Sequence, residues 1–277
     1  MALASVNFFS ISLMRNVSVN VIIPVDKYGH DGSLKAERKP FKTLYLLHGI
    51  FGDYTDWVNG TRILSWASAK NLAVVMPSGD NHFYVDGPVG YGDRYSEFIG
   101  KELVEITRAM FPLSDKREDT FIGGLSMGGY GAMMNGLKYN DVFGSIISLS
   151  GALVTDRMND STDDVDGIIG RRSYYESVFG DLSKVEGSDR DCFALVKMLK
   201  ERDISFPGIY IACGTEDSLL DANRSFMRLL KENDIEVTYV EAPGAHTWEF
   251  WDKYIHEALN WLVPEEGSEG VSSGNVQ

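Results

Sequence analysis

The segment Gly124-Leu125-Ser126-Met127-Gly128 has the pattern Gly-x-Ser-x-Gly, which is typical of a serine on a sharp turn between a strand and a helix. A strand pattern over 120–125 precedes it, and a helix pattern over 127–139 follows it. Such a turn strains the serine backbone, and side chains at 124 and 128 would collide with the neighbouring strand and helix. We therefore predict that Ser126 is a nucleophile. The alternative is a glycine-rich turn that contains an incidental serine.

A serine hydroxyl is a weak nucleophile unless a base accepts its proton. In folds with this serine turn, the base comes last along the chain, on a loop after a strand. His246 meets both conditions, because it follows the strand expected over 236–240 and the turn Pro243-Gly244. The other four histidines precede the serine or fall inside the last helix pattern: His30, His48, His82 and His256. We predict that His246 is the base.

The base needs a carboxylate that orients the imidazole and stabilises its cationic form. Asp217 lies on the loop after the strand expected over 208–213, between the serine and the histidine in chain order. We therefore predict Asp217 as the acid, with Glu216 as the second candidate. A purely structural alternative is that Asp217 caps the following helix.

Acyl transfer also needs donors for the oxygen that becomes negative in the transition state. The first is expected to be the backbone N–H of Met127, at the beginning of the helix that follows the serine. The second is expected on His48-Gly49-Ile50-Phe51-Gly52, after the strand over 43–47, with the N–H of Ile50 as the best candidate. His48 itself is predicted to shape this loop rather than to act on the substrate.

These side chains must be held by alternating strands and helices. Strands are expected over 6–13, 17–25, 43–47, 72–76, 120–125, 145–149, 208–213 and 236–240. Helices are expected near 61–70, 95–110, 127–139, 190–202, 219–232 and 248–262. This alternation predicts an α/β fold with a mostly parallel sheet covered by helices on both faces. The first two strands, joined by 14–16, are expected to add an antiparallel hairpin at one edge.

We expect a single domain over 1–264, with an insertion at about 152–189 and a disordered tail over 265–277. The insertion is acidic and contains glycines, but it also contains Tyr174, Tyr175 and Phe179, which indicates that it packs on something. The tail is polar and rich in glycine and serine, a composition typical of disorder.

The 277 residues are 44% hydrophobic and 24% charged, with a formal net charge of −14, so repulsion from phosphates argues against nucleic-acid binding. The two cysteines, Cys192 and Cys213, lack metal-ligand spacing and are expected to be reduced. The apolar beginning has no preceding positive charge and favours a strand over a secretion signal. No run of about 18 apolar residues predicts a membrane span. We expect a cytoplasmic protein.

Four segments together resemble the esterase D-type branch of the α/β-hydrolases: LLHGIFGDYTDW, GGLSMGGYGAM, ACGTEDSLLDANR and PGAHTWEFWDKYI. The chain looks most like bacterial tributyrin esterases, with acetyl-xylan and feruloyl esterases as relatives, over roughly residues 5–262. The resemblance implies a carboxylesterase with Ser126, Asp217 and His246 as triad, Ile50 and Met127 as oxyanion donors, and no metal or organic cofactor. S-formylglutathione hydrolases of this branch carry a Ser-Gly-Leu-Thr-Cys-type stretch where this chain has residues 48–52, which argues against that substrate.

The expected reaction is hydrolysis of short-chain acyl esters, such as tributyrin-like, acetyl or feruloyl sugar esters, through an acyl-enzyme. Phe51, Trp57 and Trp248 are candidates for the walls of the substrate pocket, although aromatic residues are more often part of a core. The expected partner is a small-molecule ester, without nucleic acid or membrane, and the chain is a candidate homo-oligomer. The alternatives are an S-formylglutathione-type thioesterase, an acyltransferase on the same triad, and a non-catalytic binding module.

Overall fold

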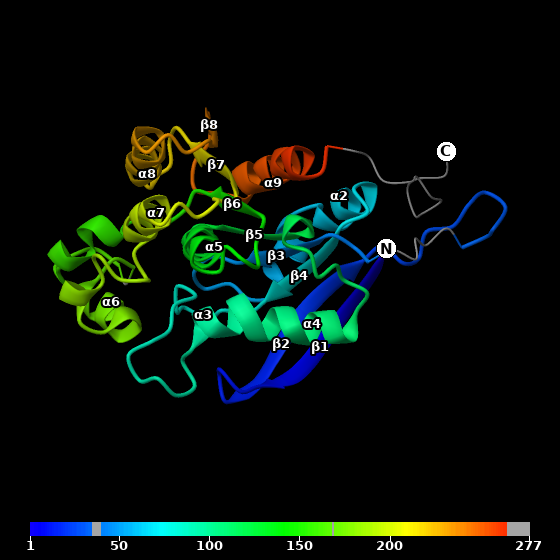
Figure 1. Cartoon of the computed structure of the whole chain (residues 1–277), viewed down its shortest axis with the longest axis horizontal. Helices are drawn as coiled ribbons and strands as arrows, with labels where there is room; N and C mark the ends of the chain where they lie inside the picture. Colours follow the sequence, from blue (N-terminus) through cyan, green and yellow to red (C-terminus); the bar gives the residue numbers. More distant parts are fainter. Residues whose placement is uncertain (35–39, 168, 265–277) are drawn as a thin grey trace.

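The computed structural model of the chain describes residues 1–34, 40–167 and 169–264. Over these ranges the strands form one eight-stranded sheet in the order β1-β2-β4-β3-β5-β6-β7-β8 (Figure 1). The strands are β1 (Ala2–Ser10), β2 (Arg15–Ile23), β3 (Thr43–Leu47), β4 (Ala73–Pro77), β5 (Thr120–Leu125), β6 (Ser145–Leu149), β7 (Gly208–Gly214) and β8 (Thr238–Ala242). The pairs β1–β2 and β2–β4 are antiparallel, and the remaining neighbours are parallel. The predicted fold class is confirmed.

Helical segments separate the parallel strands, as the alternating sequence pattern predicts. They are α1 (Asp56–Gly60), α2 (Ile63–Ala69), α3 (Tyr95–Glu97), the π-helical turn η1 (Phe98–Glu102), α4 (Leu103–Met110), α5 (Met127–Lys138), α6 (Arg172–Phe179), α7 (Cys192–Glu201), α8 (Leu220–Glu232) and α9 (Trp248–Leu262). Short 3₁₀ turns are η2 (Arg117–Asp119), η3 (Thr155–Asp160) and η4 (Leu182–Lys184).

The sheet has a hydrophobic core on each face, because its central strands are apolar on both sides. In β3, Tyr45 contributes to the core that also contains residues of α4, α5, α7 and α8. Its neighbours Leu44 and Leu46 contribute to the second core, with residues of α1, α2 and α9. Figure 1 shows α2 and α9 on one side of the sheet and α4 on the other. This burial fixes the strand ends, and therefore the loops that follow them.

The hairpin turn lies earlier than the sequence pattern predicts. Residues 11–14 form the turn, and β2 begins at Arg15, whereas the prediction placed the turn at 14–16. The Glu102 carboxylate explains the shift, because it accepts hydrogen bonds from the N–H groups of Ile11 (2.7 Å) and Ser12 (3.1 Å). Met14 closes the turn with a positive φ of 49°.

Three further predictions are corrected in detail. The helix expected near 61–70 is α2, shorter at both ends and preceded by the separate short helix α1, and the strand expected over 236–240 is β8, two residues later. The helix expected over 95–110 is present but contains the π-helical turn η1 in its middle. The insertion at 152–189 contains η3, α6 and η4. The single domain over 1–264 stays a prediction, and the tail predicted over 265–277 lies outside the described residues.

Candidate active site

The three residues predicted to do the chemistry meet at the carboxyl ends of the parallel strands. Ser126 follows β5 directly, Asp217 lies on the loop after β7, and His246 lies on the loop after β8. His246 Nε2 lies 2.9 Å from Ser126 Oγ, and His246 Nδ1 lies 2.8 Å from Asp217 Oδ2. The partners fix the imidazole tautomer: Nδ1–H donates to the carboxylate, and Nε2 accepts from the serine hydroxyl. A continuous hydrogen-bonded chain therefore joins carboxylate, imidazole and hydroxyl.

Ser126 has the strained backbone that its turn demands, with φ 55° and ψ −119°. Its N–H donates to Leu149 O at 2.9 Å, which fastens the turn to the end of β6. A Cβ at Gly128 would lie 2.5 Å from the backbone oxygens of Leu47 and His48, and a Cβ at Gly124 would collide with the Gly128 carbonyl. The collisions expected at 124 and 128 are confirmed, so this tight turn requires both glycines.

Asp217 holds the imidazole from a buried position, since its side chain has no exposed surface. Burial raises the pKa of this carboxyl, but hydrogen bonds from His246 and the Leu219 N–H outweigh burial and lower the pKa below its ordinary value. The Asp217 carboxylate is therefore ionised at neutral pH, where the imidazole acts as a base. Its second oxygen, Oδ1, accepts the hydrogen bond from the Leu219 N–H at 2.8 Å. One oxygen thus shapes the loop, and the other faces His246.

Glu216, the second candidate for the acid, has a different set of contacts. Its carboxylate accepts hydrogen bonds from the Gly244 N–H and from the Thr215 hydroxyl. These contacts lower the pKa of Glu216 at the protein surface. Glu216 therefore fastens the loop that carries His246, whereas Asp217 makes the contact with the ring.

His48 shapes the loop after β3, as the sequence predicts. The ring is buried, its Nε2 accepts a hydrogen bond from the Gly79 N–H at 2.8 Å, and its Nδ1 donates to the Gly49 carbonyl at 2.6 Å. Burial lowers the pKa of His48, so the ring is held neutral between these two backbone partners. The hydrogen bond from the Gly79 N–H therefore depends on an uncharged histidine, whereas the one to the Gly49 carbonyl does not.

The two amides predicted as oxyanion donors lie on adjacent segments. A Cβ at Gly49 would lie 3.6 Å from the Ser126 Cβ, so the loop that contains Ile50 packs directly against the serine turn. Met127 is the first residue of α5, where backbone N–H groups have no partner within the helix. Among the described residues, neither the Ile50 nor the Met127 N–H has a hydrogen-bond acceptor. Both are free to receive an oxygen atom.

The three aromatic candidates for the pocket have different environments. Phe51 is 62% exposed and lines a cavity. Trp57 is 1% exposed, and its Nε1–H donates to Leu47 O at 3.0 Å. It therefore belongs to the core and cannot contact a substrate in this conformation, contrary to the sequence prediction. Trp248 packs edge-on against Trp57 and Trp251, and its contribution to the pocket stays a prediction.

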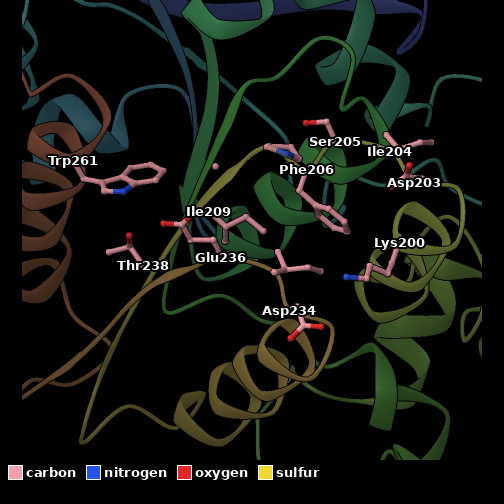
Figure 2. A pocket seen from close by; sticks show the side chains of 13 residues that line it. Lys200, Asp203, Ile204, Ser205, Phe206, Ile209, Asp234, Glu236, Thr238 and Trp261 are labelled. Atoms are coloured by element: carbon pink, nitrogen blue, oxygen red, sulfur yellow. The ribbon is translucent and has the colours of Figure 1, made fainter.

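Two cavities lie at opposite ends of the parallel strands. One, of about 380 Å³, lies beside the 48–52 loop and is lined by Ile50, Phe51, Asn81, Ile169, Arg171, Ser173 and Tyr174. The other, of about 680 Å³, lies where β7 and β8 begin, between Trp261, Thr238 and Phe206 (Figure 2). Because the triad candidates follow the carboxyl ends of the strands, the smaller cavity is the one beside the candidate active site.

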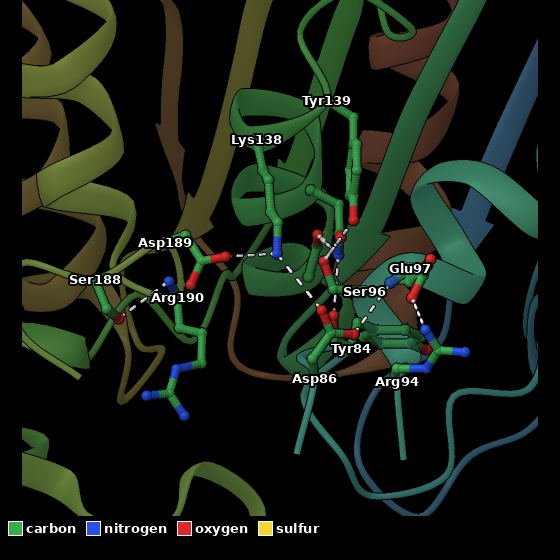
Figure 3. A network of polar contacts seen from close by, with 12 residues as sticks. Tyr84, Asp86, Arg94, Ser96, Glu97, Lys138, Tyr139, Ser188, Asp189 and Arg190 are labelled. Carbon is green, nitrogen blue, oxygen red and sulfur yellow. Dashed lines mark hydrogen bonds and ion pairs between the residues drawn. The ribbon is translucent and has the colours of Figure 1, made fainter. Parts of the chain in front are cut away.

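The insertion packs against the helix that follows the serine. At the end of α5, Lys138 Nζ lies 2.7 Å from an Asp189 carboxylate oxygen and 3.6 Å from one of Asp86 (Figure 3). Tyr130, also on α5, donates its hydroxyl hydrogen bond to Arg190 O at 2.5 Å. These contacts fix the far end of the insertion relative to the nucleophile turn.

In residues 1–34, 40–167 and 169–264, no group of three or more His, Cys, Asp or Glu side chains is arranged to hold a metal ion. Within the same ranges, no helix is both long enough and apolar enough to cross a membrane.

Comparison with known proteins assigns the chain to a family. Residues 10–262 match the family model described as "Putative esterase". The chain belongs to this esterase family. It is 45% identical over 262 residues to the acetyl esterase of Caldicellulosiruptor saccharolyticus, covering 95% of this chain and 98% of the relative. The protein is thus a carboxylic ester hydrolase with the α/β-hydrolase fold.

Two solved structures of Staphylococcus aureus esterase-fold proteins are similar in shape. The fluorophosphonate-binding serine hydrolase FphF superimposes with a TM-score of 0.84 at 31% identity, over 95% of this esterase and 99% of that chain. The S-formylglutathione hydrolase FrmB superimposes with a TM-score of 0.81 at 31% identity, over 95% of this esterase and 98% of that chain.

Sequence reasoning missed two residues of the esterase's smaller cavity, Asn81 and Arg171. Asn81 bridges the 48–52 loop and the insertion, and Arg171 brings the only charge among the described residues that line this cavity. Neither lies in a recognisable motif. The available signal was the adjacent pair Arg171-Arg172 in a segment rich in acidic residues.

Proposed function

We propose that the protein is a serine carboxylesterase that hydrolyses short-chain acyl esters, acetyl esters in particular, through an acyl-enzyme. The observation that carries the proposal is the hydrogen-bonded chain from Asp217 through His246 to Ser126, with distances of 2.8 and 2.9 Å. In this role Ser126 is the nucleophile, His246 the base and Asp217 the residue that orients the imidazole.

In the first step, Ser126 Oγ attacks the ester carbonyl carbon while its proton moves to His246 Nε2. The carbonyl oxygen becomes negative and accepts hydrogen bonds from the N–H groups of Ile50 and Met127. His246, now cationic beside the ionised Asp217, gives its proton to the oxygen of the departing alcohol. The acyl group stays bonded to Ser126.

In the second step, a water molecule replaces the alcohol. His246 accepts a proton from this water as its oxygen attacks the acyl carbon, and the same two amides hold the developing oxyanion. Collapse of the intermediate returns the proton to Ser126 Oγ and releases the carboxylic acid. The same residues thus serve both halves of the reaction.

The preference for acetyl and other short acyl groups rests on the relative from Caldicellulosiruptor saccharolyticus, an acetyl esterase. A second candidate is thioester hydrolysis, which the likeness to the S-formylglutathione hydrolase FrmB favours. The oxyanion loop of this chain, His48-Gly49-Ile50-Phe51-Gly52, argues for the oxygen ester. Transfer of the acyl group to an alcohol would use the same residues, and product analysis with added alcohols separates it from hydrolysis.

The test is a series of 4-nitrophenyl esters from acetyl to octanoyl, with acetylated xylan, methyl ferulate and S-formylglutathione assayed alongside. We expect the highest kcat/KM for the shortest acyl chains. Ser126→Ala should lower kcat by about 10⁵-fold or more, because the covalent step is lost. Ser65→Ala, at an exposed position on α2, is the matched control and should retain full activity. Equal activity of Ser126→Ala and the wild-type protein would contradict the proposal.

A further inference from the structure

The smaller cavity lies between the predicted oxyanion loop and the insertion. Its walls are Ile50 and Phe51 on one side and Ile169, Arg171, Ser173 and Tyr174 on the other, and its volume is about 380 Å³. The proposed function places the Ile50 N–H on the substrate carbonyl oxygen. A substrate held there therefore has one of its ends beside this cavity.

Asn81 holds the two walls at a fixed separation. Its side-chain oxygen accepts a hydrogen bond from the Phe51 N–H at 2.8 Å, and its backbone oxygen accepts one from the Tyr174 hydroxyl at 2.7 Å. The ring of Tyr174 also packs against Phe83. The cavity is therefore formed before a substrate arrives, as ligand sites usually are.

In the part of the chain that the structure describes, Arg171 is the one charged residue that lines the cavity, in a protein with a net charge of −14. Its Nε is buried and has no hydrogen-bond partner. Its side chain forms no ion pair among the described residues, although the Asp163 carboxylate is near enough to be attracted to its charge. The adjacent Arg172 differs, because it donates to Glu176 Oε1 at 2.7 Å and to Asn159 O at 2.8 Å. The buried Nε is out of reach of a group in the cavity, so such a group would be bound by the terminal nitrogens of the guanidinium, whose charge no described ion pair neutralises.

We propose that Arg171 selects esters that carry a carboxylate on the portion of the substrate lying in this cavity. A guanidinium presents planar N–H donors that match the two oxygens of a carboxylate, and such charge-assisted hydrogen bonds are stronger than neutral ones. The inference rests on the proposed function, and it names a substrate class that the net charge of the protein alone would disfavour.

The test compares esters of nearly equal shape that differ in charge. For a carboxylate on the alcohol, the pair is 4-acetoxybenzoate and its methyl ester. For a carboxylate on the acyl group, the pair is the mono-4-nitrophenyl ester of adipic acid and the same compound with its free carboxyl group converted to a methyl ester. The readout is the ratio of kcat/KM for the anionic ester to that for the neutral ester, and the pair that responds identifies the portion of the substrate in the cavity.

Arg171→Gln should lower this ratio by about 10- to 100-fold for one of the two pairs. Intrinsic reactivity cancels, because the same two esters are compared in each protein. Arg171→Lys should restore part of the ratio. Arg157→Gln, which removes the same charge from an exposed position in the insertion, is the matched control and should leave the ratio unchanged.

An unchanged ratio in Arg171→Gln for both pairs would overturn the proposal, while hydrolysis of the neutral esters would leave the proposed function intact. Failure of the wild-type protein to hydrolyse any ester would instead contradict the proposed function. If the glutamine variant does not fold, inhibition of the wild-type protein decides the matter. For at least one of the two pairs, a carboxylate-bearing product should inhibit more strongly than its methyl ester, and the reverse order in both pairs would overturn the proposal.

Discussion

At the scale of single residues, Ser126 has a strained backbone with a positive φ of 55°. A positive φ at a residue other than glycine costs about 1–3 kcal/mol, and the surrounding structure must supply that energy. Here the Ser126 N–H donates to Leu149 O, and the Ser126 carbonyl accepts from the Ala152 N–H at 3.0 Å. Two buried hydrogen bonds therefore hold the strained turn and aim the hydroxyl at His246.

Asp217→Asn tests the contact between carboxylate and imidazole. The amide oxygen or nitrogen that faces Nδ1 cannot stabilise an imidazolium as a carboxylate does, so kcat for a 4-nitrophenyl ester should fall by about 10³- to 10⁴-fold. Glu216→Gln is the matched control, because Glu216 binds the Gly244 N–H rather than the ring. We expect it to keep activity within about tenfold of the wild-type protein. A larger loss in Glu216→Gln than in Asp217→Asn would reverse the assignment of the acid.

Gly128→Ala tests the close approach of α5 to β3. The added Cβ would lie 2.5 Å from two backbone oxygens that cannot rotate away, so the helix must move. We expect a loss of about 1–3 kcal/mol in the free energy of unfolding, measured with urea. Gly208→Ala, whose Cβ would lie 3.2 Å from a serine hydroxyl, is the control and should change stability far less. Equal stability of the two variants would contradict this account.

The candidate triad was predictable because each member lies in a short local pattern that a fixed strand order brings together. Ser126 and His246 are 120 residues apart, yet each follows the end of a strand that its own sequence reveals. Trp57 was wrongly predicted to line the pocket, because its burial involves contact with Trp248, which is distant in the sequence. No local sequence pattern reports such a contact. Arg171 was missed for the same reason, since its isolation depends on which side chains surround it in space.

At the scale of elements, Glu102 joins the N-terminal hairpin to the helix that crosses it. Its carboxylate accepts hydrogen bonds from the Ser10 hydroxyl and from the N–H groups of Ile11 and Ser12. Burial raises the pKa of Glu102, but these hydrogen bonds outweigh burial and lower it below its ordinary value. The hairpin turn is therefore held by a charge from η1.

Glu102→Gln should reveal this contact through its pH dependence. A carboxyl group whose pKa is lowered by folding contributes stability above its ordinary pKa, and that stability is lost as pH falls through the folded-state pKa. The wild-type protein should thus be more stable than Glu102→Gln at neutral pH, and the difference should shrink below pH 4.5. Urea unfolding at several pH values measures it. Glu105→Gln, at an exposed position on α4, is the control and should change stability at neutral pH far less. A pH-independent difference for Glu102→Gln would contradict this account.

The elements themselves were predictable wherever burial is uniform. β5 is buried at all six positions, and its predicted bounds match the structure. β8 lies at the sheet edge with exposed and half-buried residues, so its pattern is weak and its bounds shifted by two residues. The hairpin turn depends on Glu102, about 90 residues away, and no signal within the hairpin could have revealed it.

At the scale of the whole molecule, the insertion packs on the central layer through aromatic rings. Phe179 contacts Phe83 and Tyr130 with ring centroids 5.5 and 6.2 Å apart, and Tyr175 contacts Phe83 at 6.1 Å. The sequence indicated packing from the aromatic content of this segment, and these contacts confirm it. The surface that receives the rings comes from residues before and after the candidate nucleophile.

Phe179→Ala should therefore destabilise the protein as a core substitution does. Phe179 is 1% exposed, and truncation of a buried phenylalanine costs about 3–5 kcal/mol. Tyr91→Ala is the control, because Tyr91 is 80% exposed and should change the free energy of unfolding by less than about 0.5 kcal/mol. Urea unfolding of both variants measures the contrast. Similar values for the two would show that the insertion unfolds separately from the rest.

The base of the candidate triad is attached to the strand with the least support. Among the described strands, β8 pairs with β7 alone and has no buried position, whereas the serine follows a strand buried throughout. Such an edge frays at low free energy, long before the interior opens. Catalytic competence should accordingly vanish under milder heating or less denaturant than spectroscopic signals of the core. During refolding it should be the last property to return, which makes turnover a reporter of this one edge.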